Sequence, residues 1–196
     1  MTKGEQTRRD IVEKAAPLFN QKGFEGTSLA DLMQATGLQK GGIYRHFSGK
    51  KELAAEAFDY AWEKAVRGRL DGVADVPDCV DRLKKTIDNF VERRAGLVPG
   101  GCPLMNTAVE ADDGNPVLRE KARAALNEWR SVIAEIVRDG QRGRELHKDV
   151  DPVAVATIVI SSLEGAIMFS RLEKTREALF TVGKHLDGYL RSLSRL

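Results

Sequence analysis

A chain of 196 residues has room for one small domain and one larger domain with a core of its own. Its 42% hydrophobic and 31% charged residues exclude a disordered protein, and no uncharged apolar stretch reaches the ~20 residues of a membrane span. The net charge is only +2, yet residues 1–51 carry nine lysines and arginines against five acidic residues, which places the attraction for polyanions at this end.

The first predicted helix has one apolar face, formed by Ile11, Ala15, Leu18 and Phe19. Pro17 lies in the middle of this helix. A proline inside a helix removes one backbone hydrogen bond and costs ~3 kcal/mol or kinks the helix. We therefore expect a bent first helix that still contributes its apolar face to the core.

The stretch from Thr27 to Glu52 predicts two short helices joined by a tight turn and followed by a longer helix. Ser28, with Asp31 three residues later, fits a capping box at the start of the first short helix. Gly37 follows that helix, where a helix-turn-helix needs a residue that tolerates a positive φ. The outer face of the second short helix carries Gln39, Lys40, Gly41, Gly42, Tyr44, Arg45 and His46. Slim and hydrogen-bonding side chains of this kind suit the major groove of DNA.

Two lysines, Lys50 and Lys51, open the longer helix. A cation at a helix N-terminus opposes the helix dipole by ~0.3–1 kcal/mol, so the pair is locally unfavourable. A bound anion reverses the sign, because the lysines and the free N–H groups then both point at it. DNA phosphate is the natural candidate, and two solvated lysines without a partner are the alternative.

The run GIYRHFSGKKEL, with KGFEGTSLADLMQATGL upstream of it, resembles the N-terminal domain of the tetracycline-repressor (TetR) family of bacterial transcription regulators. The resemblance covers roughly residues 7–55 and implies an all-α fold. It implies a three-helix helix-turn-helix DNA-binding domain over residues 1–51 and a six-helix ligand-binding and dimerisation domain over residues 52–196.

We expect the DNA contacts to divide between bases and phosphates. The residues expected to face the groove are Gln39, Lys40, Gly41 and Tyr44. Those expected to position phosphates are Thr27, Ser28, Tyr44, His46, Lys50 and Lys51.

Beyond Lys51 the pattern is helical throughout, without a strand signal. The expected helices cover about 50–70, 80–91, 104–110, 117–139, 152–172 and 174–193. The segment from Val153 to Leu163 contains no charged residue, and its apolar side chains lie on all sides of a helix, so it must be buried on more than one face.

The last helix carries a seam of Leu179, Gly183, Leu186, Leu190 and Leu193, with the spacing of packed helices. The seam can pack inside its own monomer or against a second chain. The resemblance to the TetR family implies the second arrangement, a homodimer through the last two helices.

The same resemblance implies a small effector, apolar or amphipathic, bound among the C-terminal helices. The side chains expected to line its pocket are Tyr60, Trp62, Phe90, Cys102, Met105, Asn106, Trp129, Met168 and Phe169. Ordinary core packing is the alternative for each of them. Asn106 and Glu110 are among the few polar groups that such a pocket needs.

Cys102 follows two glycines and precedes a short helix, whose N-terminus can lower the pKa of a thiol. Reaction with an electrophile or oxidant is one interpretation, and a small buried residue that fills space is the other. Cys79, beside Asp78 and Asp81, is expected to react more slowly. Two cysteines are too few for a disulfide framework and fit a reducing compartment.

We therefore expect a cytoplasmic, ligand-responsive transcriptional repressor that binds a palindromic operator as a homodimer and needs no cofactor, metal or membrane. The first residues lack the apolar core of a signal peptide. No catalytic motif accompanies the three histidines, so an enzyme is not expected. A helical enzyme that borrowed the motif and a DNA-organising protein without sequence preference remain the rival classes.

Overall fold

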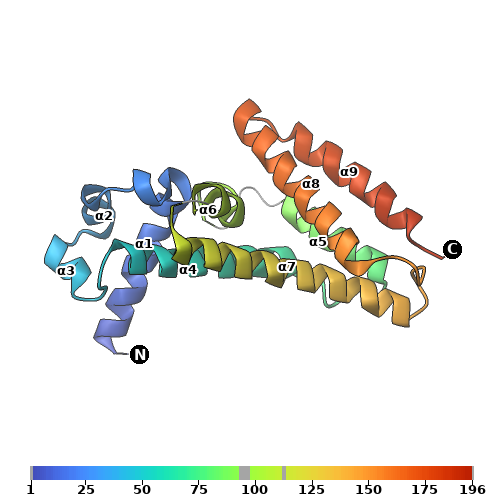
Figure 1. Ribbon diagram of the computed structural model, residues 1–196, viewed down its shortest axis with the longest axis horizontal. Helices are drawn as coiled ribbons and strands as arrows, with labels where there is room; N and C mark the ends of the chain where they lie inside the picture. Colours follow the sequence, from blue (N-terminus) through green and yellow to red (C-terminus); the bar gives the residue numbers. More distant parts are fainter. Residues whose placement is uncertain (1, 93–97, 112–113, 196) are drawn as a thin grey trace. The chain divides into compact units, whose positions relative to one another are not determined.

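The computed structural model describes residues 2–92, 98–111 and 114–195, and in these residues the chain is helical (Figure 1). The helices are α1 (Lys3–Gly26), α2 (Leu29–Thr36), α3 (Lys40–Tyr44), α4 (Lys50–Leu70), α5 (Cys79–Glu92), α6 (Pro103–Ala111), α7 (Pro116–Arg142), α8 (Pro152–Glu173) and α9 (Glu177–Ser192). Over the described ranges, β pairing is limited to a bridge between Leu146 and Ser194. The predicted all-α class is confirmed.

The helices form two compact units. The first unit contains Met1–Ala65 and Ala95–Ala125, and the second contains Val66–Arg94 and Leu126–Leu196. Helices α4 and α7 therefore contribute one end to each unit. The boundary expected after residue 51 does not coincide with the limits of these packing units. As a division by function, it stays a prediction.

The core of the first unit joins α1 to the helix-turn-helix. Ile11 and Ala15 of α1 pack with Leu32 of α2 and Ile43 of α3, all of them at most 1% exposed. Local signals set the element ends: the Ser28 Oγ accepts from the Asp31 N–H at 3.1 Å. Apolar burial on one side of each short helix therefore holds the motif together.

Glycines with positive φ shape the ends of the first two helices in this unit. Gly37 ends α2 with φ 74°, and its N–H donates to the Met33 carbonyl, as the turn requires. The second glycine corrects the expectation for α1. The helix continues through Pro17, and its break in helical geometry lies at Gly23, with φ 76° and ψ 175°.

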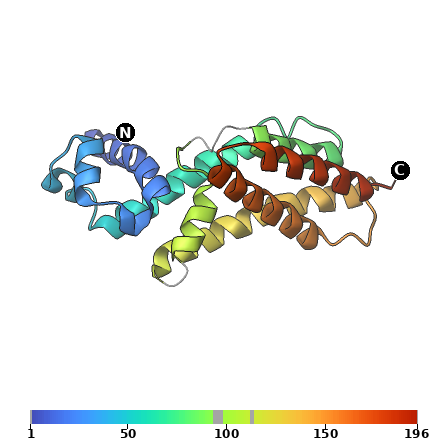
Figure 2. The ribbon, with the colours of Figure 1, turned by 90° about the horizontal axis from the view of Figure 1, so that it is seen from above.

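In the second unit, α8 and α9 run antiparallel side by side (Figures 1 and 2), and α5 packs against both. Asp151 caps α8 and Pro152 is its first residue, as predicted. On α9, Leu186 and Leu190 are fully buried inside the monomer, and an added Cβ at Gly183 would lie 3.1 Å from Val91 of α5. This seam therefore packs within its own chain, and it is not the surface left for a second chain.

Helix α8 has a buried face and, on its other side, an apolar face that is exposed to solvent. Its large exposed side chains include Val153, Ile158, Met168, Phe169 and Leu172. By length and hydropathy alone, α8 meets the requirement for crossing a membrane, as packed helices of soluble proteins also do. On α7, Leu126 is also partly open to solvent, with 36% of its surface exposed.

Candidate nucleic-acid interface and effector side chains

Helix α3 presents a slim polar face to solvent. Gln39 is its N-cap residue but makes no side-chain capping bond, so its amide stays available to a partner. Lys40 and Gly41 are exposed, and a Cβ added at Gly41 would meet nothing within 4 Å. Ile43 is fully buried and anchors the helix. The face can therefore approach the floor of a groove closely.

Around α3 lie the residues expected to position phosphates. Tyr44 and His46 are half-buried and Ser28 is exposed. The Ser28 hydroxyl donates to the Asp31 carboxylate at 2.7 Å. The Lys22 ammonium and this hydroxyl together hold the pKa of Asp31 far below its usual range.

Thr27 is different from these residues, because its side chain is fully buried. The Thr27 hydroxyl donates to the Gly23 carbonyl at 2.6 Å. Its position gives it a structural role between α1 and α2, and the expected contact with a phosphate does not fit this burial.

The N-terminus of α4 combines the two lysines with a capping carboxylate. The Ser48 N–H and hydroxyl both donate to the Glu52 carboxylate at 2.6 Å. These bonds and the Arg8 guanidinium lower the pKa of Glu52 to about 2. Lys51 is exposed, whereas the Lys50 Nζ lies 4.4 Å from the ring centroid of Phe24, a cation–π contact.

Arg8 is a structural residue that the sequence analysis missed. Its guanidinium pairs with Glu52 at 2.5 Å and with Glu56. It also donates to the His46 carbonyl and lies 4.2 Å from the ring centroid of Phe47. Arg8 thus connects α1 to the start of α4 and to the residues that follow α3.

Five of the nine side chains expected around an effector belong to the first unit: Tyr60, Trp62, Cys102, Met105 and Asn106. Tyr60 packs against the core of α1, and burial raises its pKa. The Asn106 amide donates to the Asn20 backbone carbonyl at 2.9 Å and to the Asn20 side-chain oxygen at 3.0 Å. Tyr60 and Asn106 therefore hold elements of the first unit together.

The other four belong to the second unit. Phe90 and Trp129 stack with their centroids 5.6 Å apart. The buried Arg69 guanidinium lies 3.7 Å from the Trp129 ring centroid and 4.0 Å from the Glu164 carboxylate. Met168 and Phe169 are 45% and 51% exposed on α8, so in a single chain they line no enclosed pocket.

Comparison with known proteins decides the family. Residues 11–57 match the family described as bacterial regulatory proteins, tetR family, and residues 79–186 match the tetracyclin repressor-like C-terminal domain. The chain belongs to the TetR family of transcription regulators.

Solved TetR-family structures resemble the chain over its full length. A regulator from Chloroflexus aurantiacus is 43% identical with a TM-score of 0.94, each chain covering all of the other. One from Cytophaga hutchinsonii is 35% identical with the same TM-score, over 100% of this chain and 98% of its own. The HTH-type transcriptional repressor DhaR of Mycobacterium sp. (strain GP1) is 26% identical over 88% of this chain and 86% of its own.

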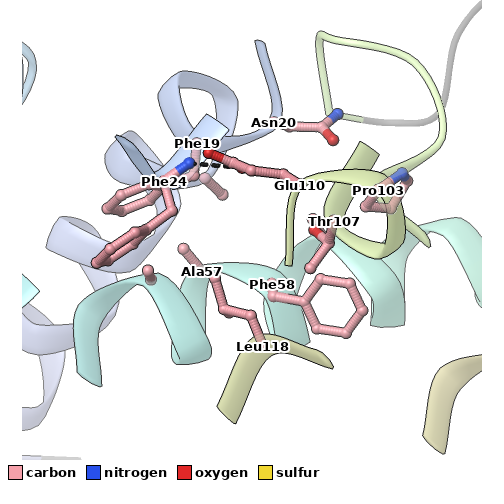
Figure 3. A pocket seen from close by; sticks show the side chains of 12 residues that line it. Phe19, Asn20, Phe24, Ala57, Phe58, Pro103, Thr107, Glu110 and Leu118 are labelled. Atoms are coloured by element: carbon pink, nitrogen blue, oxygen red, sulfur yellow. Dashed lines mark hydrogen bonds between the residues drawn. The ribbon is translucent and has the colours of Figure 1, made fainter. Parts of the chain in front are cut away.

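This TetR-family chain has a small pocket in its first unit, between α1, α4, α6 and the start of α7 (Figure 3). Its apolar lining includes Phe19, Phe58 and Leu118, and Asn20 and Glu110 are among its polar groups. Water-sized molecules can enter only about 20 Å³ of it, which is room for one water. None of the nine expected effector side chains lines it.

Both thiols of the chain are buried. Cys102 is 3% exposed, which favours the space-filling interpretation over reaction with an electrophile. Burial and then the Glu145 carboxylate raise the pKa of Cys79 to about 12. Asp78 contributes less to this shift than Glu145, a residue 66 positions away that sequence reasoning did not consider.

Proposed function

We propose that this TetR-family regulator is a cytoplasmic repressor that binds an inverted-repeat operator as a homodimer and is released by a small effector. One observation carries the DNA-binding part. An open polar face, with Gln39, Lys40 and Gly41, stands above a single buried anchor, Ile43, and a lysine pair follows it. This is the arrangement that base contacts flanked by phosphate contacts need. The name of the relative DhaR, a transcriptional repressor, supports repression.

The homodimer is supported by the apolar surface of the last two helices. Met168, Phe169 and Leu172 of α8 and Phe180 of α9 are each at least 45% exposed. Contiguous apolar groups on a soluble protein favour association. Because the seam with Leu186 is covered within the monomer, the proposed contact uses the outer face of α8 and its neighbours on α9.

The effector is an apolar or amphipathic small molecule bound in the C-terminal region. The stacked Phe90 and Trp129, with Arg69 and Glu164 beside them, offer the mixture of aromatic and polar groups that such ligands need. Release requires the effector to prefer a state whose recognition helices are wrongly spaced. Helix α4, which contributes to both units, is the proposed lever, and operator DNA must weaken effector binding by the same factor.

The test begins with selection of bound sequences from random DNA by the wild-type protein. We expect an inverted repeat whose half-sites are centred ~34–36 Å apart on one face of the duplex, a footprint over it, and a dimer in sedimentation. Equal affinity for selected and random DNA would refute operator recognition and favour a DNA-organising protein. A stable monomer at micromolar concentration would refute the dimer.

A further inference from the structure

The end of α1 is a separate helical turn. Gly23 has φ 76° and ψ 175°, a backbone region that is essentially restricted to glycine. The helix resumes at Phe24 and ends at Gly26. The first N–H groups of a helical segment have no acceptor within that segment, so the turn after Gly23 needs an acceptor from elsewhere.

Glu110 of α6 supplies this acceptor. Its Oε2 accepts from the Phe24 N–H at 2.8 Å (Figure 3). Its Oε1 accepts from the Glu25 N–H at 2.9 Å. A carboxylate at a helix N-terminus is favoured by its charge as well as by its hydrogen bonds. A Cβ at Gly23 would lie 2.5 Å from the Glu110 Oε1. Glycine is therefore what lets the carboxylate approach this backbone.

The capped turn carries two parts of the DNA interface. The Gly23 carbonyl, at the start of the turn, accepts a hydrogen bond from the Thr27 hydroxyl. Ser28, the residue after Thr27, caps α2. In the middle of the turn, the Phe24 ring lies 4.4 Å from the Lys50 Nζ. A shift of the turn therefore displaces both the start of α2 and the Lys50 ammonium.

A second tie reinforces the first. Asn106 precedes Glu110 by one helical turn, so both side chains project from the same face of α6. The Asn106 amide donates to Asn20 in the turn of α1 before Gly23. Helix α6 thus forms hydrogen bonds with α1 before and after the break at Gly23, and both helices belong to one compact unit.

We propose that Glu110 is a positioning residue for DNA recognition: its carboxylate caps the last turn of α1 and so sets the start of α2 and the place of Lys50. Movement of α6 then changes operator affinity through this cap. The inference rests on the proposed DNA-binding function, but the cap itself can be tested without DNA.

The first measurement is amide hydrogen exchange of the DNA-free, full-length protein. Wild type should protect the Phe24 and Glu25 amides, and Glu110→Ala should raise their exchange about tenfold or more. Glu110→Gln keeps one acceptor oxygen and should expose one of the two amides. Glu120→Ala is the matched control, because it removes the same charge from an exposed residue that pairs with Arg123 instead. Unchanged exchange in Glu110→Ala overturns the cap whatever the protein does on DNA.

The second measurement is affinity for the selected operator. Removing a negative charge should by itself strengthen binding to a polyanion. A lower operator affinity of Glu110→Ala is therefore opposite to the effect of charge, and the loss of positioning explains it. We expect about a tenfold loss and a salt slope lower by about one, as for Lys50→Ala. The double variant should lose little more than either single variant. Glu120→Ala should bind at least as well as wild type.

The outcomes separate the two ideas. A wild-type protein that selects no DNA refutes the proposed function and leaves the exchange result standing. A wild type that binds its operator while Glu110→Ala binds equally well, with the same salt slope, overturns the positioning role. Where Glu110→Ala fails to fold, Glu110→Gln should show the same losses with smaller size, and a wild-type affinity for that variant counts against the proposal.

Discussion

Substituting Gly23 with alanine tests the break in α1 directly. The backbone region at φ 76° and ψ 175° costs an L-residue about 1–3 kcal/mol. The new Cβ would lie 2.5 Å from the Glu110 carboxylate, which can retreat only by giving up its two hydrogen bonds. These bonds are exposed, so we assign them the lower range of about 0.5–1 kcal/mol each. The expected loss in the free energy of unfolding is therefore about 2–5 kcal/mol.

Urea denaturation of the full-length protein, followed by circular dichroism, measures this loss. Gly26→Ala is the matched control: its Cβ would meet Lys22 at an ordinary 3.6 Å, and alanine there should be neutral or stabilising by up to about 1 kcal/mol. In a Glu110→Ala background, Gly23→Ala should retain only its backbone part, about 1–3 kcal/mol. Equal stabilities of the Gly23 and Gly26 variants would show that the break has no such strain.

Three further predictions concern DNA binding, assembly and pH. Lys51→Ala should weaken binding to all DNA sequences alike and lower the salt slope by about one, whereas Lys40→Ala should also change the sequence preference. Identical footprints and preferences in both variants would argue against the division into phosphate and base contacts. Phe169→Glu should give a folded monomer in sedimentation, and a dimer that survives this substitution would place the interface elsewhere. Leu186→Ala should instead lower the free energy of unfolding by about 2–5 kcal/mol. The pKa of Glu52 is lowered from 4.5 to about 2. The stabilising contribution of its carboxylate is therefore complete above pH 4.5 and is lost as the pH falls towards 2. Glu52→Gln should lower the free energy of unfolding more at pH 7 than at pH 2, and an equal loss at both pH values would contradict the lowered pKa.

Element ends were predictable because their signals are local. Ser28 with Asp31, Gly37, and Asp151 with Pro152 each act within a few residues, and the structure has these caps and turns where the sequence placed them. The start of α4 at Lys50 was predicted for the same reason. The family resemblance added the division into a DNA-binding domain and a C-terminal domain, which no local signal contains.

Side-chain roles that depend on distant partners were not predictable. The periodicity of Leu186 and Leu190 shows only that a face is buried, and it cannot tell α5 and α8 of the same chain from a second chain. Asn106 resembles a pocket residue in the sequence, but its partner Asn20 lies 86 residues away. A signal for Asn20 did exist, because it continues the buried series of Ala16 on α1. The charged partners of Arg8 had no comparable signal.

In the proposed function, helix α3 separates the residue that anchors the helix to the core from the residues that contact the bases. It has five residues, of which Ile43 is buried, while its residues 40 and 41 and the preceding N-cap residue 39 are exposed. Exchange of exposed residues away from special contacts changes stability by only about 0.5 kcal/mol. Variation at these three positions can therefore accumulate without loss of fold, so a duplicated copy of this protein is free to acquire a different operator. A library randomised at these positions is, by the same reasoning, a practical source of regulators with new targets.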